Sequence, residues 1–248
     1  LDSVRVLDQE SEGCRNGSAL GEMWDDGERR FRMFRIIAVE REFGCGGGGI
    51  ACELARRLGW KLWDQQLTGE IAKRAQVTES AVALCDERVD SRLYRLARAF
   101  WRGSYERGMA IANSRAFDTD RMMSMVEEIM RNIAAEGNAV VVGRGGPFFL
   151  RDRQDTFRVF TYAPKDEKIR RLVALGKSRE EAEDLVDNVD QERIAYIKHY
   201  FNADWPVRAL YHMMINTVVG DENVISAILN GMQALESPTA EMTRRRVR

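Results

Sequence analysis

The chain has 248 residues, of which 44% are hydrophobic and 31% are charged, and its formal net charge at pH 7 is -1. This length suits one globular domain, and the small net charge gives no basis for general affinity for nucleic acids. No apolar run is long enough for a membrane-spanning helix, and the first residues lack the features of a signal peptide. We therefore expect a cytoplasmic protein without membrane or nucleic-acid partners, whose four cysteines lack metal-type spacing and are free thiols.

The start of the chain is rich in Gly, Asp, Glu and Ser and has no sustained apolar periodicity. Such a composition does not provide enough apolar surface for a packed core. We therefore interpret residues 1–32 as a flexible leader and expect one domain over residues 33–235.

A strand, a glycine-rich loop and a helix are predicted in succession over residues 34–58. Residues 34–39 are apolar enough for a buried strand, and Ile50, Leu54 and Leu58 recur at helical spacing. Glycines between the two elements let a ligand approach the backbone closely, and the N–H groups and dipole of a helix start favour an anion. We interpret the loop as a phosphate cradle, the alternative being a tight turn without a ligand; it consists of Gly44, Cys45, Gly46, Gly47, Gly48 and Gly49.

Two phosphate-binding motifs compete for this loop. Its G-x-G-x-x-G spacing matches the dinucleotide-binding fingerprint, and Asp64 lies about 20 residues further on, where a ribose-binding acid would belong. The P-loop motif requires Lys followed by Ser or Thr, whereas Gly47 and Gly49 occupy those positions. The charged residues 40–42, however, stand where a dinucleotide turn should be tight and apolar. The local pattern alone favours the dinucleotide interpretation, whereas the rest of the chain argues against it.

Helices are expected over residues 65–75, 78–89 and 91–111. The last of these mixes arginines with aromatic side chains. A helix of this kind either contacts nucleic acid or packs half-exposed on its own domain, and we interpret it as a packing helix.

A helix and a strand are predicted around a second glycine-rich segment. Residues 119–136 place methionine and branched apolar side chains on one helical face, which predicts a core helix that ends at Gly137. Residues 139–142 are apolar throughout, which predicts a central strand. Arg144 follows this strand between glycines, at the edge where open α/β sheets bind ligands. A surface salt bridge is the alternative role for this arginine.

The remaining elements alternate in the same way. A strand is predicted over residues 157–162, a helix from Pro164 to Leu175, a capped helix over residues 178–201, a strand over 213–215 and a last helix from Asp221. Alternation of strands and helices indicates an α/β fold with a mostly parallel sheet of about five strands. The polar segment 236–248 ends in arginines, and we interpret it as a flexible, solvated basic tail rather than an RNA-binding arm.

Several blocks along the chain occur in a characteristic order. They are Arg41-Glu42-Phe43-Gly44-Cys45-Gly46-Gly47, Trp63-Asp64-Gln65-Gln66-Leu67, Asp86-Glu87, Gly143-Arg144-Gly145 with residues 150–153, and Asp190-Gln191-Glu192-Arg193 with Tyr196, Tyr200, Asp204-Trp205 and residues 215–217. Together they resemble the cytidylate kinase-like family, a branch of the P-loop nucleoside monophosphate kinases, over about residues 34–235. The resemblance implies a three-layer α/β/α P-loop kinase fold with a helical lid at about residues 165–208.

The resemblance also implies a function. It is transfer of the ATP γ-phosphoryl group, with Mg²⁺, to CMP, dCMP or a related small acceptor, so that nucleotides are the expected partners and no oligomeric state is implied. The glycine loop would hold the donor phosphates, Asp64 and Arg144 the acceptor, and Asn216 and Thr217 the adenine edge. Arg193, in the lid beside Asp190, would neutralise charge on the transferred group.

The chain departs from the family pattern at the donor loop. Gly47 replaces the usual P-loop lysine, Gly48 stands where relatives commonly carry arginine, and Gly49 offers no hydroxyl to Mg²⁺; Gly145 replaces an acid of ordinary cytidylate kinases. We hypothesise that Arg41 folds back over the phosphates and acts with Arg144 and Arg193 in catalysis. No metal ligand is assigned, although Glu40 or Glu42 could reach the metal through water. The alternatives are a catalytically weak or inactive nucleotide-binding regulatory protein and an NAD-binding oxidoreductase.

Overall fold

The structure is a computed structural model that describes residues 34–64 and 119–236. The interpretations made for residues 1–32, for 65–111 and for the tail after residue 236 lie outside these described residues.

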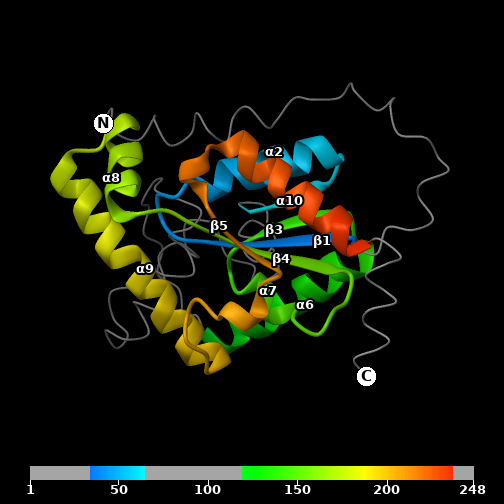
Figure 1. The fold of residues 1–248 in the computed structure, drawn as a ribbon. Helices are drawn as coiled ribbons and strands as arrows, with labels where there is room; N and C mark the ends of the chain where they lie inside the picture. The colour runs from blue at the N-terminus through cyan, green and yellow to red at the C-terminus, as the bar shows by residue number, and fades with distance from the viewer. Residues whose placement is uncertain (1–33, 65–118, 237–248) are drawn as a thin grey trace.

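A sheet of five parallel strands forms the centre of the described structure (Figure 1). The strands are, in spatial order, β2 (Lys61–Trp63), β3 (Ala139–Val142), β1 (Ile36–Arg41), β4 (Thr156–Tyr162) and β5 (Met213–Asn216). The predicted α/β class and parallel sheet are therefore confirmed. Residues 36–39 of the central strand are fully buried, because helices cover both faces of the sheet.

Two helical layers cover the sheet (Figure 1). One face packs against α2 (Gly47–Leu58) and α10 (Asp221–Glu236), and the other against α6 (Thr119–Glu136), the short α7 (Gly146–Phe149) and the end of α9 (Arg179–Phe201). The side chains of β1 alternate between the two layers, as strand geometry requires. Ile37 and Val39 belong to the α2–α10 cluster, and Ile36 and Ala38 to the α6–α9 cluster.

Helix α9 and the preceding α8 (Lys165–Ala174) extend beyond one end of the sheet (Figure 1). Their facing side chains form a separate apolar cluster, against which Phe43 of the glycine loop packs. The predicted cap of α9 is present, since the Ser178 hydroxyl accepts from the Glu181 N–H at 3.1 Å. The α8–α9 pair, which occupies the predicted lid region, is therefore packed directly onto the loop.

Some details differ from the sequence-based expectations. The four-residue helix α7 was not predicted, because it is too short to show a helical period, and the same holds for the 3-10 turns η2 (Arg208–Leu210) and η3 (Thr217–Val219). Cys45 is a free, buried thiol, but Cys52 is disulfide-bonded, so the expectation of free thiols is wrong for Cys52. None of the described helices combines the length and apolar character needed to cross a membrane.

Candidate active site at the carboxyl edge of the sheet

The glycine loop connects β1 to α2 through two residues in the left-handed region. Gly44 has φ 74° and Gly46 has φ 81°, a conformation that glycine adopts without strain. Gly46 is the N-cap of α2 and makes no side-chain capping hydrogen bond. A Cβ added at Gly48 or Gly49 would meet no described atom within 4 Å. The start of α2 is therefore open toward a ligand, as a phosphate cradle requires.

Gly47, at the usual lysine position, is enclosed. A Cβ at this residue would lie 2.8 Å from Cβ of Arg41 and closer still to the Thr161 hydroxyl. Real Cβ atoms do not approach so closely, so any larger side chain would displace its neighbours. Glycine at this position is therefore required by the path of the Arg41 side chain.

Arg41 bridges the loop and the neighbouring strand ends. Its stem passes Gly47, its guanidinium lies against Gly143 at the end of β3, and Nη2 lies 3.9 Å from Oδ1 of Asp64 at the end of β2. The side chain is only 11% exposed. The hypothesis that Arg41 acts at the phosphates is thus compatible with its position between the two predicted subsites.

Asp64 and Arg144, the predicted acceptor residues, lie next to each other. Arg144 Nη1 donates to the Asp64 carbonyl oxygen at 3.4 Å. Arg144 follows the end of β3 and has a left-handed φ of 54°. Burial lowers the pKa of the Arg144 guanidinium to about 10, against the opposing effect of the Asp64 carboxylate. The guanidinium thus stays charged at neutral pH in a poorly solvated site, where contact with an anion is strong.

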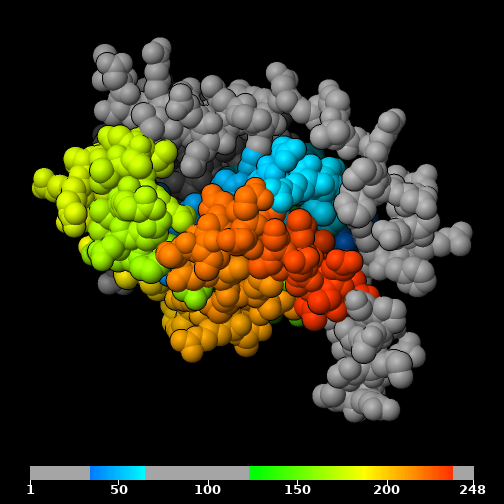
Figure 2. Space-filling model, turned by 45° about the horizontal axis from the view of Figure 1, so that its top comes forward, coloured from blue at the N-terminus to red at the C-terminus, as the bar shows by residue number. Residues whose placement is uncertain are grey.

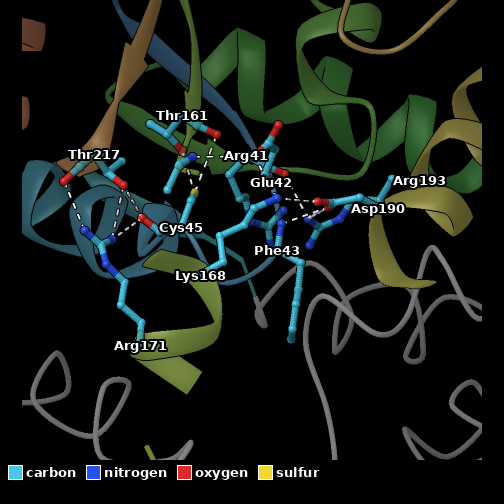
Figure 3. Close-up of polar contacts among 11 residues, drawn as sticks. Arg41, Glu42, Phe43, Cys45, Thr161, Lys168, Arg171, Asp190, Arg193 and Thr217 are labelled. Carbon is cyan, nitrogen blue, oxygen red and sulfur yellow. Dashed lines mark hydrogen bonds and ion pairs between the residues drawn. The ribbon is translucent and has the colours of Figure 1, made fainter. Parts of the chain in front are cut away.

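Arg193, the predicted lid arginine, is part of a cluster that joins α8 and α9 to the loop (Figure 3). Its Nη1 donates to the Arg41 carbonyl oxygen at 2.8 Å and to Asp190 at 3.0 Å. Burial and the charge of nearby Arg41 lower the Arg193 pKa. The structure therefore brings together four of the predicted site residues, which are Arg41, Asp64, Arg144 and Arg193.

Thr217 holds the other side of the loop (Figure 3). Its hydroxyl donates to the Cys45 carbonyl oxygen at 2.7 Å, and Arg171 of α8 donates to the Thr217 hydroxyl at 3.1 Å, to its carbonyl at 3.0 Å and to the same Cys45 carbonyl. Asn216 accepts from the Val218 N–H at 3.1 Å and so caps the η3 turn. α8, α2 and the segment after β5 accordingly share one face of the molecule (Figure 2).

Replacing Thr217 by valine should destabilise the protein, because its fully buried hydroxyl donates to the Cys45 carbonyl and accepts from Arg171. We expect the free energy of unfolding to fall by about 1–3 kcal/mol. Urea unfolding followed by circular dichroism would measure this change. Thr217→Ser, which keeps the hydroxyl, should recover most of the loss; equal stabilities of the valine variant and the native chain would show that the contact is dispensable.

Sequence reasoning missed Lys168 and Arg171, the two α8 side chains that reach the loop. Their sequence context is a charged helix, which has the same pattern whether its cations face solvent or a binding site. The start of this helix at Pro164, just after the carboxyl end of β4, was the available signal.

The carboxylates near the loop do not form a magnesium cage. Among the described residues there is no group of three or more His, Cys, Asp or Glu side chains that could hold a metal. Glu42 is bonded to Lys168 at 2.8 Å, and burial raises the pKa of Glu40, which favours its neutral form. These residues do not fit a protein-held Mg²⁺, so we assign no step of the reaction to a metal held by this chain.

Comparisons with known proteins bear on the family and the fold of this chain. A family model described as the cytidylate kinase-like family matches residues 36–218. The crystal structure of an uncharacterized protein from Eubacterium ventriosum ATCC 27560 is 20% identical, with a TM-score of 0.58 over 80% of this chain and 98% of that chain, which supports the fold. Shikimate kinases from Bacteroides thetaiotaomicron and Acinetobacter baumannii, the latter in complex with shikimate, are each 16% identical at a TM-score of 0.44, over 82% of this chain and 98% and 96% of theirs. A search of curated proteins found no match.

Proposed function

Since this chain belongs to the cytidylate kinase-like family, we propose that it transfers the γ-phosphoryl group of ATP to a nucleoside monophosphate, with CMP or dCMP as first candidates. The observation that carries the proposal is the path of the Arg41 side chain. This one side chain runs from the glycine loop to the strand ends that bear Asp64 and Arg144. A donor cradle and an acceptor site must lie this close together for direct transfer between two bound nucleotides.

Each site residue has a distinct role in the proposed reaction. Backbone N–H groups at the start of α2 hold the donor phosphates, and Arg144 grips the acceptor phosphate while Asp64 accepts from its sugar or base. An oxygen of the acceptor phosphate bonds to the γ-phosphorus as the bond to the bridging oxygen breaks, and that electron pair leaves with ADP. Arg41 and Arg193 stabilise the charge that develops during this exchange. Mg²⁺ bound with ATP would supply further charge neutralisation, and no residue of this chain is assigned to hold it.

The adenine of ATP is proposed to lie at the edge formed by Asn216 and Thr217. The Thr217 hydroxyl is hydrogen-bonded to the loop at Cys45, so the adenine would contact the backbone of this edge and the side chains of Val218 and Val219. Val218 and Val219 are 52% and 54% exposed and offer an apolar surface to a flat ring.

The proposal is tested by ADP release from Mg-ATP across a panel of nucleoside monophosphates. We expect turnover selective for CMP or dCMP. Arg144→Lys should raise the acceptor KM by about 10- to 100-fold, because a lysine lacks the planar fork that makes two charge-assisted hydrogen bonds, worth about 1.5–3 kcal/mol. The control is Arg151→Ala, a 60% exposed residue paired with Asp152 outside the site. An unchanged KM in Arg144→Lys would exclude Arg144 as an acceptor residue.

A regulatory protein that binds nucleotide with little turnover is the second candidate. The observation that favours it is the donor loop, in which a side chain at Gly47 would clash with Arg41 and Thr161 and Gly49 offers no hydroxyl. Mg-ATP binding without ADP release for any acceptor would support it. The dinucleotide alternative fits less well, because β3 separates β1 from β2, whereas these strands are neighbours in dinucleotide-binding folds.

A further inference from the structure

The carboxylate of Asp190 is surrounded by donors that would suit a phosphoryl group (Figure 3). Its Oδ1 accepts from the backbone N–H of Phe43 at 2.8 Å and from Arg193 at 3.0 Å, and its Oδ2 accepts from Nζ of Lys168 at 3.2 Å. A backbone N–H of the glycine loop, a guanidinium and an ammonium thus converge on one anionic group. Phosphate sites are built from the same three kinds of donor.

Lys168 is held unusually close to the loop. Its side chain is 8% exposed, and its Nζ also contacts Oε2 of Glu42 at 2.8 Å. A Cβ at Gly44 would lie 3.2 Å from Cβ of Lys168, so the glycine allows α8 to approach. Burial acts to lower the Lys168 pKa, but the hydrogen bonds that Lys168 donates to Glu42 and Asp190, together with the charges of these carboxylates, outweigh burial and raise the pKa. Lys168 is therefore a buried cation beside the glycine loop, whose residues 44–49 include no lysine or arginine.

The partners of Lys168 distinguish it from the other α8 cation at the loop. At the loop, Arg171 donates to main-chain carbonyls and a hydroxyl that are enclosed in the protein, and its Nε pairs with Glu167 of its own helix. Lys168 contacts only carboxylates among the partners described for it, and a carboxylate can return to water when an anion replaces it. With Arg193, Lys168 balances the two charges of Glu42 and Asp190.

We propose that Lys168 is the donor-site cation that the glycine loop lacks, and that Asp190 holds the position of an ATP phosphate group until ATP displaces it. ATP binding then releases Asp190 from Phe43, Lys168 and Arg193 and transfers the two cations to the triphosphate. The displaced carboxylate competes with ATP for the same donors, so it weakens binding. This inference rests on the proposed function only in assuming that the loop binds ATP.

Two variants separate the two parts of the proposal, and Mg-ATP binding measured by calorimetry without acceptor is the readout. Asp190→Asn keeps the shape but removes the competing charge, so we expect the Kd for Mg-ATP to fall about tenfold. The double variant Lys168→Gln/Asp190→Asn removes one charge of each sign, and its Kd should be at least tenfold higher than that of Asp190→Asn. The same measurements with Mg-ADP should show smaller shifts, because ADP lacks the γ-phosphate. Asp187→Asn is the matched control on the exposed side of α9, where Asp187 pairs with Lys165.

The outcomes distinguish this inference from the proposed function. A folded Asp190→Asn variant that binds Mg-ATP no more tightly than the native chain would overturn the competing role of Asp190. Equal affinities of the single and double variants would overturn the role of Lys168, and either result leaves the kinase proposal intact if the native chain turns over. Failure of the native chain itself to bind Mg-ATP would overturn both proposals.

Discussion

Replacing Arg41 by alanine should lower kcat/KM for the monophosphate acceptor by about 10³-fold, the lower end of the effect of an arginine that stabilises a transferring phosphoryl group. The reason is geometric, since this side chain bridges the donor loop at Gly47 and the acceptor residue Asp64. Mg-ATP affinity should change much less, because backbone N–H groups make most of the donor contacts. Steady-state kinetics with calorimetric ATP binding would measure both quantities.

Two comparisons identify the role of Arg41. Arg41→Lys keeps the charge but shortens the side chain and removes the planar guanidinium that can make two parallel hydrogen bonds. We therefore expect this variant to recover only part of the turnover lost in Arg41→Ala. Arg56→Ala removes a 57% exposed arginine on α2, paired with Glu53, and should leave kinetics and melting temperature unchanged. Turnover and Mg-ATP affinity of Arg41→Ala equal to those of the native chain would remove Arg41 from the proposed mechanism.

The sheet and the helices around it were predictable because their signals are local. Two short, largely apolar runs favour buried strands, one at residues 139–142 and one at residues 34–39. The glycines between the second of these runs and the next helical pattern place a loop at the carboxyl edge of the sheet. These features follow from near neighbours in the sequence, and the observed elements reproduce them.

The polar contacts of the site were not predictable in the same way, because they join residues far apart in the chain. Asp190 meets Phe43 across 147 positions, and Arg171 meets Cys45 across 126. Lys168 has the sequence environment of a surface lysine, and only its position against Gly44 and Glu42 shows that it is buried. A sequence pattern specifies residue types, whereas the role of such a cation is set by the anion that the fold places beside it.

Gly47 shows that the sequence is equally limited within the P-loop motif. The sequence shows that a lysine is missing, but it does not show that the space for one is filled by Arg41 and Thr161. The loss of the lysine and the placement of Arg41 are therefore linked. A chain with this arginine path cannot regain the usual P-loop by one substitution.

Gly47→Ala should consequently lower the free energy of unfolding by about 1–3 kcal/mol, the usual effect of an overpacked site. The added methyl would also push Arg41 from its path, and such a displacement of a catalytic group should reduce turnover by about 10²-fold. The neighbouring change Gly48→Ala is the matched control for stability alone, because its methyl meets no described atom and should stabilise α2 by about 0.5 kcal/mol. Thermal unfolding measured on both variants, and ADP release measured on Gly47→Ala, would test the prediction.

Gly47→Lys is the decisive variant, since it restores the usual P-loop lysine. Its Cβ meets the same atoms as that of alanine, so we expect lower stability and turnover than in the native chain, despite the added cation. Higher turnover in Gly47→Lys would show that the loop can open around a lysine. That result would mean that Arg41 does not take the place of the P-loop lysine and that the glycine at position 47 reduces catalysis.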